Sequence, residues 1–198
     1  MTISLLAAYT KNEHIIGAQG KIPWKLPSER NYFKKICNNK FVLMGRKSFD
    51  EIGKPLSYCN LIVLTKNNGK KQLLQIQKDE LSTSRTIPPI QFASSLEEAF
   101  ELCKDQEEIL IAGGQSLYEQ TLPKANKIYA TEINLKIKGD SYFPQINSSW
   151  KKTILESKTE NGISYDYVIY EKKNKLTLML CHQKMRYLQF LPILNIYD

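Results

Sequence analysis

A single carboxylate, Glu29, follows a short segment of rigid and apolar residues, Ile-Pro-Trp-Lys-Leu-Pro-Ser, over positions 22–28. Pro27 suits the first position of a helix, because its missing N–H is not needed there and its fixed φ is already helical. Glu29 then falls in the first turn, and Phe33, four residues later, shares its helix face. Such a carboxylate either complements the helix dipole or is a working acid beside an aromatic ring.

A glycine pair connects an apolar run to a helical pattern further along the chain. Residues 109–112 are typical of a buried strand, Gly113 and Gly114 follow, and the helical pattern begins at Gln115. Backbone without a Cβ lets a ligand approach closely, and the N–H groups of a helix start favour an anion. The segment matches neither the G-x-G-x-x-G fingerprint nor a Walker loop. The pair therefore predicts either a phosphate cradle of another kind or a plain tight turn.

A second turn of the same kind carries positive charge. Residues 41–44 form an apolar run, followed by Gly45, Arg46, Lys47 and Ser48. Arginine offers paired planar donors to a phosphate, lysine a mobile charge, and serine a hydrogen bond. Two cradles on neighbouring strands favour a dinucleotide, and the cationic one suits an additional phosphate such as the 2′-phosphate of NADPH. Lys66, two residues after the apolar run 61–64, is a candidate to join this cationic site.

These residues must be positioned by alternating strands and helices, a pattern typical of an α/β protein with a mainly parallel sheet. The expected strands cover residues 3–9, 41–44, 61–64, 109–112, 128–134, 150–156 and 165–171. The expected helices cover residues 27–37, 46–52, 96–103 and 115–122. Asn161-Gly162 predicts a hairpin turn between the last two strands, and the spacing of Ser95 and Glu98 predicts a capping box.

Length and composition suit one globular domain. The chain has 198 residues, 42% of them hydrophobic, which allows one sizeable core and is short for two. The cysteines lack metal-type spacing and predict reduced thiols in the cytoplasm; they are Cys37, Cys59, Cys103 and Cys181. No secretory signal is expected, and no run approaches the roughly 18 apolar residues of a membrane-spanning helix.

The formal net charge of +8 raises the question of a nucleic-acid partner. The cations are scattered, and half of the excess lies after residue 171, where five cations accompany a single carboxylate, Asp198. No basic stripe with interleaved aromatic residues occurs, so we expect no nucleic-acid partner. The lysine-rich segment 66–89 is longer than the connections of most compact domains, and residues 72–81 within it could form a surface helix.

Taken in order, the motifs resemble the dihydrofolate reductase family from about residue 3 to residue 171. The segments that carry the resemblance are Ile16-Gly17, Ile22-Pro23-Trp24-x-Leu26-Pro27-x-Glu29, Met44-Gly45-Arg46-Lys47-Ser48-Phe49-x-x-Ile52-Gly53-x-Pro55-Leu56, Gly113-Gly114-x-x-x-Tyr118, Tyr129-x-Thr131 and Gly139-Asp140-x-x-Phe143-Pro144. Each is modest alone, but their order and spacing are highly specific.

The resemblance implies an α/β fold with a central mixed, mostly parallel sheet flanked by helices and a C-terminal antiparallel hairpin. Residues 1–172 would form the domain, and residues 173–198 an apolar, basic extension. The implied activity is NADPH-dependent reduction of 7,8-dihydrofolate to 5,6,7,8-tetrahydrofolate, by hydride transfer to C6 and protonation of N5. The implied enzyme is a cytoplasmic monomer that supports one-carbon metabolism and thymidylate synthesis, with no membrane partner.

The resemblance also implies roles for single residues. Glu29 would bind the 2-amino group and N3 of the pterin, supported by Thr131 and a water, while Ile22 and Trp24 would lie on a loop that closes over the nicotinamide. Burial should raise the pKa of Glu29 and the helix start should lower it, and the sequence does not decide between them. The Gly113–Gly114 peptide bond is expected to be cis.

The remaining site residues follow from the same resemblance, with no metal site expected. The substrate-binding residues would be Leu6, Ala8, Glu29, Arg30, Phe33, Lys34, Ile52, Leu56, Ala112, Tyr118 and Thr131. The cofactor-binding residues would be Ala8, Ile16, Gly17, Gly45, Arg46, Lys47, Ser48, Leu64, Thr65, Lys66, Gly113, Gly114, Gln115, Ser116, Leu117 and Tyr118.

Three departures from the family pattern affect this expected site. The segment after Leu56 lacks the arginine that clamps the carboxylate of the folate tail in many members. The candidates to replace it are Arg30, Lys34 and Lys54. Our hypothesis is that Arg30 with Lys34 supplies this charge; the alternative is a solvated Arg30 and weaker tail binding. Gln115 stands where the family often has a third glycine, with little expected effect at a helix start. The long segment 66–89 would border the adenine, either as added charge or as a solvated insertion.

Three alternatives stay open at this point. The chain could reduce another heterocycle, as the ribosylaminouracil reductase of riboflavin synthesis does, although that reductase lacks a pterin-binding acid at the position of Glu29. It could also bind folate or NADPH without turnover. For the extension, packing on the domain or self-association is favoured over contact with an anionic membrane surface.

Overall fold

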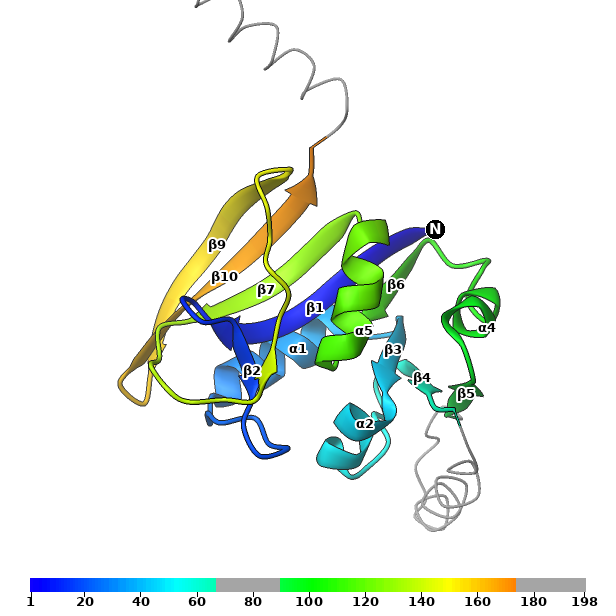
Figure 1. The fold of residues 1–198 in the computed structure, drawn as a ribbon, viewed down its shortest axis with the longest axis horizontal. Coiled ribbons are helices and arrows are strands. Elements are labelled where there is room, and N and C mark those ends of the chain that lie inside the picture. The colour runs from blue at the N-terminus through cyan, green and yellow to red at the C-terminus, as the bar shows by residue number, and fades with distance from the viewer. Residues whose placement is uncertain (67–89, 174–198) are drawn as a thin grey trace, which may run out of the picture.

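An eight-stranded sheet organises residues 1–66 and 90–173, which are the residues that this computed structural model describes. The strand order is β5-β4-β3-β6-β1-β7-β10-β9, as Figure 1 shows. The strands are β1 (Thr2–Thr10), β3 (Phe41–Gly45), β4 (Asn60–Leu64), β5 (Gln91–Ala93), β6 (Glu108–Ile111), β7 (Lys127–Ile133), β9 (Trp150–Glu160) and β10 (Ile163–Lys172). Only β10 is antiparallel to its neighbours, β7 and β9, so the predicted mixed sheet with a C-terminal hairpin is confirmed.

Helices cover both faces of the sheet. α1 (Pro27–Cys37) and α2 (Arg46–Ile52) pack on one face, where Cys37 and Phe49 join the same apolar cluster. α4 (Leu96–Glu101) and α5 (Gln115–Thr121) pack on the other face, and α5 continues into the 3-10 helix η1 (Leu122–Lys124). In Figure 1, α5 crosses in front of the sheet and α1 lies behind it. The bounds of α1 and α2 are those predicted, whereas α4 and α5 end earlier than predicted.

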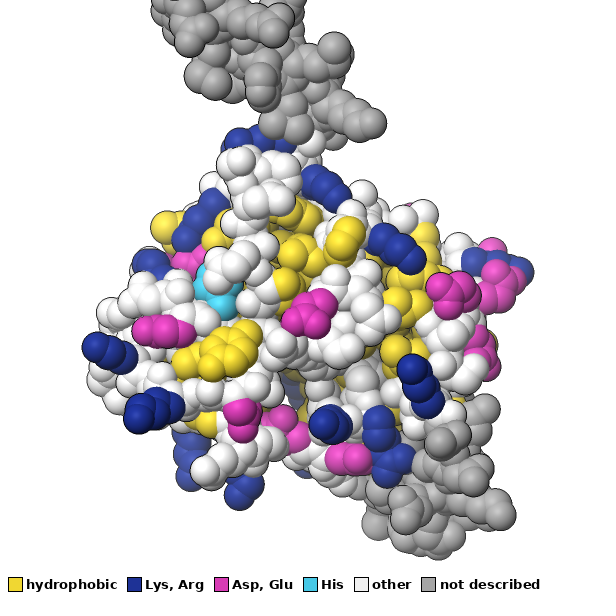
Figure 2. All heavy atoms as spheres, in the orientation of Figure 1, with side chains coloured by type: hydrophobic (Ala, Val, Ile, Leu, Met, Phe, Trp, Pro, Cys, Tyr) yellow, Lys and Arg dark blue, Asp and Glu magenta, His cyan; other side chains and the backbone are white. Residues whose placement is uncertain are grey.

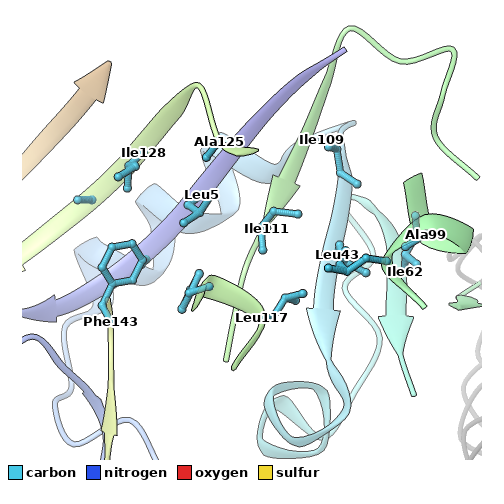
Figure 3. Packing of buried hydrophobic residues seen from close by; sticks show 14 of the residues in the cluster. Leu5, Leu43, Ile62, Ala99, Ile109, Ile111, Leu117, Ala125, Ile128 and Phe143 are labelled. Carbon is cyan, nitrogen blue, oxygen red and sulfur yellow. The ribbon is translucent and has the colours of Figure 1, made fainter. Parts of the chain in front are cut away.

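The central strands are apolar on both faces because helices cover both. Leu43 in β3, Ile62 in β4 and Ile111 in β6 are fully buried, as expected for strands inside a parallel sheet. Figure 3 shows Leu117 of α5 near Ile111, with Phe143 at the opposite end of the same cluster from Ile62. This packing fixes the strand ends from which the site is built.

Local sequence signals act where they were expected. Asn161 and Gly162 have φ values of 53° and 76°, the left-handed pair that a two-residue turn of this kind requires. Ser95 caps α4 by accepting a hydrogen bond from the N–H of Glu98 at 3.1 Å. The Glu98 carboxylate in turn accepts from the N–H of Ser94, one residue earlier than a standard capping box.

A second, two-stranded sheet pairs β2 (Ile15–Gly17) with β8 (Ser141–Tyr142). These strands and β5 were not predicted, because two or three residues show no measurable alternation. The helix expected within 72–81, and the extension from residue 174 onward, lie outside the described residues. Within the described ranges, no helix has the length and apolar character needed to cross a membrane.

Charged side chains of both signs share the face of the molecule drawn in Figure 2. Lysines and arginines lie singly or in small groups there, interspersed with acidic side chains. This face therefore does not present the continuous basic stripe that a nucleic-acid surface shows.

Candidate active site

The carboxyl ends of β1 and β6 form the natural location for a ligand. The two strands are neighbours, but the first helix after β1 (α1) and the helix after β6 (α5) lie on opposite faces of the sheet. In open α/β sheets, ligands bind at the carboxyl ends of such strand pairs. The pairing ends at Leu5 and Ile111. Just beyond it, the Tyr118 hydroxyl donates to the carbonyl oxygen of Leu6 at 2.7 Å.

Glu29 lies in the first turn of α1, partly buried at this end of the sheet. Burial is the main cause that raises the pKa values of Tyr118 and Tyr167, and the charge of Glu29 raises both further. The carboxyl group of Glu29 therefore lies within electrostatic reach of α5 on one side and of β10 on the other. The site is assembled from elements that are far apart in the sequence.

Burial also decides the ionisation of Glu29 itself. Loss of solvation raises its pKa from 4.5 to about 7, and the guanidinium of the adjacent Arg30 lowers it in part. Burial thus outweighs the charge of Arg30, and the pKa of Glu29 is raised. The sequence alone did not decide the direction of this shift. An acid whose pKa lies near neutrality is populated in both protonation states, as proton chemistry requires.

Four of the predicted substrate-binding residues form an apolar wall on the face of the sheet that α1 covers. Leu6 and Leu56 are buried in one cluster, against which Phe33 and Ala112 pack partly exposed. Thr131 is 1% exposed and lies opposite Ala8 in the β1–β7 ladder. Ile52, at the end of α2, is 36% exposed. The structure therefore brings Leu6, Leu56, Phe33 and Ala112 into one cluster, places Thr131 on the strand next to β1, and leaves Ile52 partly exposed.

The two predicted catalytic residues on the loop that precedes α1, Ile22 and Trp24, lie in different environments. Trp24 is buried and packs with Leu26 in the cluster beneath the C-terminal hairpin. Ile22 is 55% exposed, and its N–H donates to the carboxylate of Glu51 in α2 at 2.5 Å. This bond ties the loop to the opposite wall of the site, and nothing in the sequence indicated the role of Glu51.

The two cations proposed for the folate tail differ in environment. Arg30 is exposed on the outer side of α1. The ammonium of Lys34 lies 5.6 Å from the ring centroid of Tyr58, within the range of a cation–π contact. Tyr58 belongs to the segment that lacks the family's arginine. Lys34 is therefore directed toward the place where that arginine would stand.

The two predicted phosphate cradles meet side by side, because β3 and β6 are neighbours. The N–H of Gly45 donates to the carbonyl oxygen of Gly113 at 2.7 Å, and the Gly113–Gly114 peptide bond is cis, as expected. A Cβ on Gly114 would lie 3.1 Å from Ser48 Oγ, and one on Gly113 would lie 3.2 Å from the Tyr118 hydroxyl. A side chain at either position would therefore crowd a neighbouring hydroxyl group.

The helix starts at these cradles keep donors for a ligand. No side chain caps α2 at Gly45 or α5 at Gly114, and the first N–H groups of a helix have no partner within it. A bare glycine surface with outward N–H groups and nearby cations has the chemistry that a pyrophosphate requires. The residues present therefore fit a dinucleotide.

The predicted cofactor side chains occupy three kinds of place. Arg46 donates through Nε to both carboxylate oxygens of Asp50, at 2.7 and 2.8 Å. The exposed or partly exposed residues near the strand ends are Ile16, Gly17, Lys47, Ser48, Leu64, Thr65, Lys66 and Ser116. Leu117 and Tyr118 are buried in the core cluster, so their side chains support the α5 start rather than form an open surface.

Gln115 has a contact that the sequence did not indicate. Its amide oxygen accepts a hydrogen bond from the N–H of Tyr142 in β8 at 2.8 Å, and its amide nitrogen donates to Glu119 at 2.8 Å. The residue that replaces the family's third glycine thus joins α5 to the small sheet. Because Tyr142 lies 27 positions from Gln115 in the sequence, no local pattern could predict this contact.

Comparison with known proteins agrees with this architecture. The family model described as dihydrofolate reductase matches residues 2–172. A dihydrofolate reductase of Bacillus subtilis is 34% identical over 176 residues, which cover 87% of this chain and 95% of that protein. The enzyme of Haemophilus influenzae is 36% identical over 156 residues, covering 79% of this chain and 86% of that protein. One from Buchnera aphidicola is 35% identical over 183 residues, covering 89% and 100%.

The motifs at Glu29, at Arg46 and at Gly113 thus lie within one matched region, at neighbouring strand ends of one sheet. The matched relatives are covered over nearly their whole lengths, so the likeness is not confined to a shared motif. The chain belongs to the dihydrofolate reductase family and is an oxidoreductase of that family.

Proposed function

We propose that this enzyme reduces 7,8-dihydrofolate to 5,6,7,8-tetrahydrofolate with NADPH, and so supports one-carbon metabolism and thymidylate synthesis. The observation that carries the proposal is Glu29, a partly buried acid with a pKa of about 7 beside the apolar wall of the site. Its position at the carboxyl ends of the central strands, next to a dinucleotide cradle, is what a hydride-transfer site needs.

Glu29 and Thr131 hold the pterin in this proposal. The 2-amino group and N3 of the ring are adjacent donors, and a carboxylate presents two oxygens that accept such a pair. Thr131, almost fully buried on β7, adds a hydroxyl that orients the acid or a bridging water. Leu6, Ala8, Phe33 and Ala112 cover the faces of the ring, which excludes water and strengthens these hydrogen bonds.

NADPH, when bound, supplies the hydride that C6 of dihydrofolate receives. Backbone groups of Gly113, Gly114 and Ser116 would hold its pyrophosphate, and Arg46 with Lys47 would hold its 2′-phosphate. The glycine surface supports this assignment, since a Cβ on Gly114 would lie 3.1 Å from Ser48 Oγ and crowd the cradle.

The proton for N5 reaches the pterin from water, and Glu29 controls its supply. Because the pKa of Glu29 lies near 7, the group keeps its proton at slightly acidic pH and loses it above neutrality. The loop of Ile22 and Trp24 then closes the nicotinamide side of the site. Its hydrogen bond to Glu51 is one contact that holds it near α2.

Lys34, with Arg30, supplies the charge for the carboxylate of the folate tail. The cation–π contact with Tyr58 directs Lys34 toward the segment where the family's arginine is missing. We further propose a cytoplasmic monomer, with residues 1–172 as the catalytic domain; the free, buried thiols of Cys37, Cys59 and Cys103 support a reducing compartment.

NADPH oxidation by the purified protein, with dihydrofolate as substrate and NADH as comparison cofactor, tests this proposal. We expect turnover with a clear preference for NADPH, and loss of turnover in Glu29→Gln. Binding of both ligands without turnover would identify a binding protein instead. Absence of dihydrofolate binding together with retained NADPH binding would indicate a reductase for another heterocycle.

A further inference from the structure

The helix that carries Glu29 lacks a cap of its own. Its N-cap residue is Leu26, whose side chain cannot accept a hydrogen bond, and Pro27 follows at the first helical position. The N–H groups of a first turn need acceptors from outside the helix. An uncapped first turn frays readily, and Glu29 stands in that turn.

The missing acceptor comes from the tip of the C-terminal hairpin. Glu160, the last residue of β9, accepts a hydrogen bond from the N–H of Ser28 through Oε2 at 3.1 Å. Its other oxygen, Oε1, accepts from the hydroxyl of the same serine at 3.2 Å. A carboxylate that lies 132 positions away thus takes the place of the N-cap side chain, with the sign of charge that a helix start favours.

The hairpin tip is itself held against the start of the helix. The side-chain amide of Asn161 donates to the carbonyl oxygen of Lys25 at 3.2 Å, and the Tyr165 hydroxyl lies 3.5 Å from Glu160 Oε2. Tyr165 packs in the same buried cluster as Leu26. The hairpin tip therefore contacts the chain both before and after Pro27, and these contacts hold Glu160 in place.

We infer that Glu160 is a positioning residue for Glu29: it caps the first turn of α1 and so sets where the acid meets the substrate. Glu160 itself touches neither substrate nor cofactor in this assignment. The inference rests on the proposed role of Glu29 in binding dihydrofolate. It assigns to the hairpin tip a part in catalysis that acts through hydrogen bonds to Ser28.

Steady-state kinetics of Glu160→Ala and Glu160→Gln test the inference. Glutamine keeps an oxygen that accepts the N–H of Ser28, whereas alanine removes both acceptors. We expect kcat/KM for dihydrofolate to fall about tenfold in Glu160→Ala and to stay within about twofold of the parent in Glu160→Gln. NADPH binding, measured by fluorescence titration, should not change in either variant.

Glu156→Ala is the matched control, because Glu156 lies on the same strand and pairs with Lys158 at the surface, at 3.2 Å. Amide exchange of residues 28–30 should accelerate in Glu160→Ala but not in Glu156→Ala. Equal kcat/KM values in these two variants would overturn the inference, and so would a Glu160→Gln enzyme as impaired as Glu160→Ala. A parent protein without dihydrofolate reduction would refute the proposed function, while amide exchange would still report whether the cap exists.

Discussion

The N–H of Gly45 donates to the carbonyl oxygen of Gly113 at 2.7 Å, which joins the ends of β3 and β6 and sets the two cradles against each other. Ser48 Oγ is close enough that a Cβ on Gly114 would lie 3.1 Å from it. The proposed cofactor site therefore depends on the close approach of the Gly114 backbone to the Ser48 hydroxyl, and not only on charged side chains.

Gly114→Ala should weaken NADPH binding by about tenfold, because the new methyl group displaces Ser48 and occupies the cradle. Fluorescence titration with NADPH measures the effect. Ser48→Ala in the same protein removes the conflicting hydroxyl, so the double variant should recover its thermal stability while NADPH binding stays weak. A double variant that stays as unstable as Gly114→Ala would show that the Ser48 contact is not what excludes a side chain at position 114.

Arg46→Ala should raise KM for NADPH by about tenfold and leave KM for NADH unchanged, since only NADPH carries the additional phosphate. Asp50 orients the guanidinium through Nε in this structure. Lys104→Ala, three residues after the end of α4, is the control, because it removes the same charge from a surface ion pair with Glu101. An equal change of both KM values would remove Arg46 from the phosphate site.

Glu29→Gln should abolish reduction of dihydrofolate, by at least about 100-fold, while making the fold more stable at high pH. The folded-state pKa of about 7 exceeds the unfolded value of 4.5. Ionisation of Glu29 thus opposes folding progressively as the pH rises from 4.5 to about 7. The variant should gain about 3 kcal/mol of unfolding free energy at pH 8 and nothing at pH 4.

Urea denaturation at the two pH values measures this gain, and the exposed Glu156→Gln variant provides the control. In the parent enzyme, turnover should fall as the pH rises through about 7, because the reaction consumes a proton. A stability gain of Glu29→Gln that is the same at both pH values would contradict the raised pKa.

Lys34→Ala should raise KM for dihydrofolate about tenfold through loss of a charge-assisted hydrogen bond to the tail carboxylate. Dihydropteroate, which has no glutamate, should show no such change. Arg30→Leu tests the second cation in the same way. Lys35→Ala is the matched control, because Lys35 lines a groove between α1 and β9 on the side with Ser28 and Tyr32. Unchanged KM values for dihydrofolate in both Lys34→Ala and Arg30→Leu would show that neither cation binds the tail carboxylate.

Gly139→Ala should cost about 2 kcal/mol of unfolding free energy, since its Cβ would lie 2.3 Å from Ile15 Cγ2 and 2.7 Å from the carbonyl oxygen of Gly17. The pairing of β2 with β8 then cannot persist unchanged, and NADPH binding near Ile16 should weaken. Gly20→Ala is the control: it meets nothing within 4 Å and bears only the strain of a φ of +73°. Equal losses would refute the steric argument.

Elements with strong local signals were predictable from the sequence. Pro27 opens α1, and Gly53, with a φ of 71°, closes α2 through an N–H bond to Phe49 at 3.0 Å. Proline and glycine act on their own backbone, so the bounds of both helices agree with prediction. The Asn161-Gly162 turn is as local. The turns that contain Gly45 and Gly113 were also predictable, because each lies at the end of a strongly apolar strand.

Contacts between distant segments were not predictable from single residues. β2, β5 and β8 are too short to show a period, and they exist because a partner strand lies beside them. Glu51, Glu160 and the amide of Gln115 are polar surface residues in the sequence, and only their partners give them a role.

The amino-acid sequence thus determined which residue types are available for the proposed chemistry and where the local turns beside them lie. The tertiary structure decided how strongly Glu29 is desolvated, which sets its pKa near 7. It also decided that a hairpin tip caps the helix of that acid. Both depend on the sum of many surrounding atoms, because desolvation and hydrogen-bond partners are properties of a place in space and not of a position in the chain.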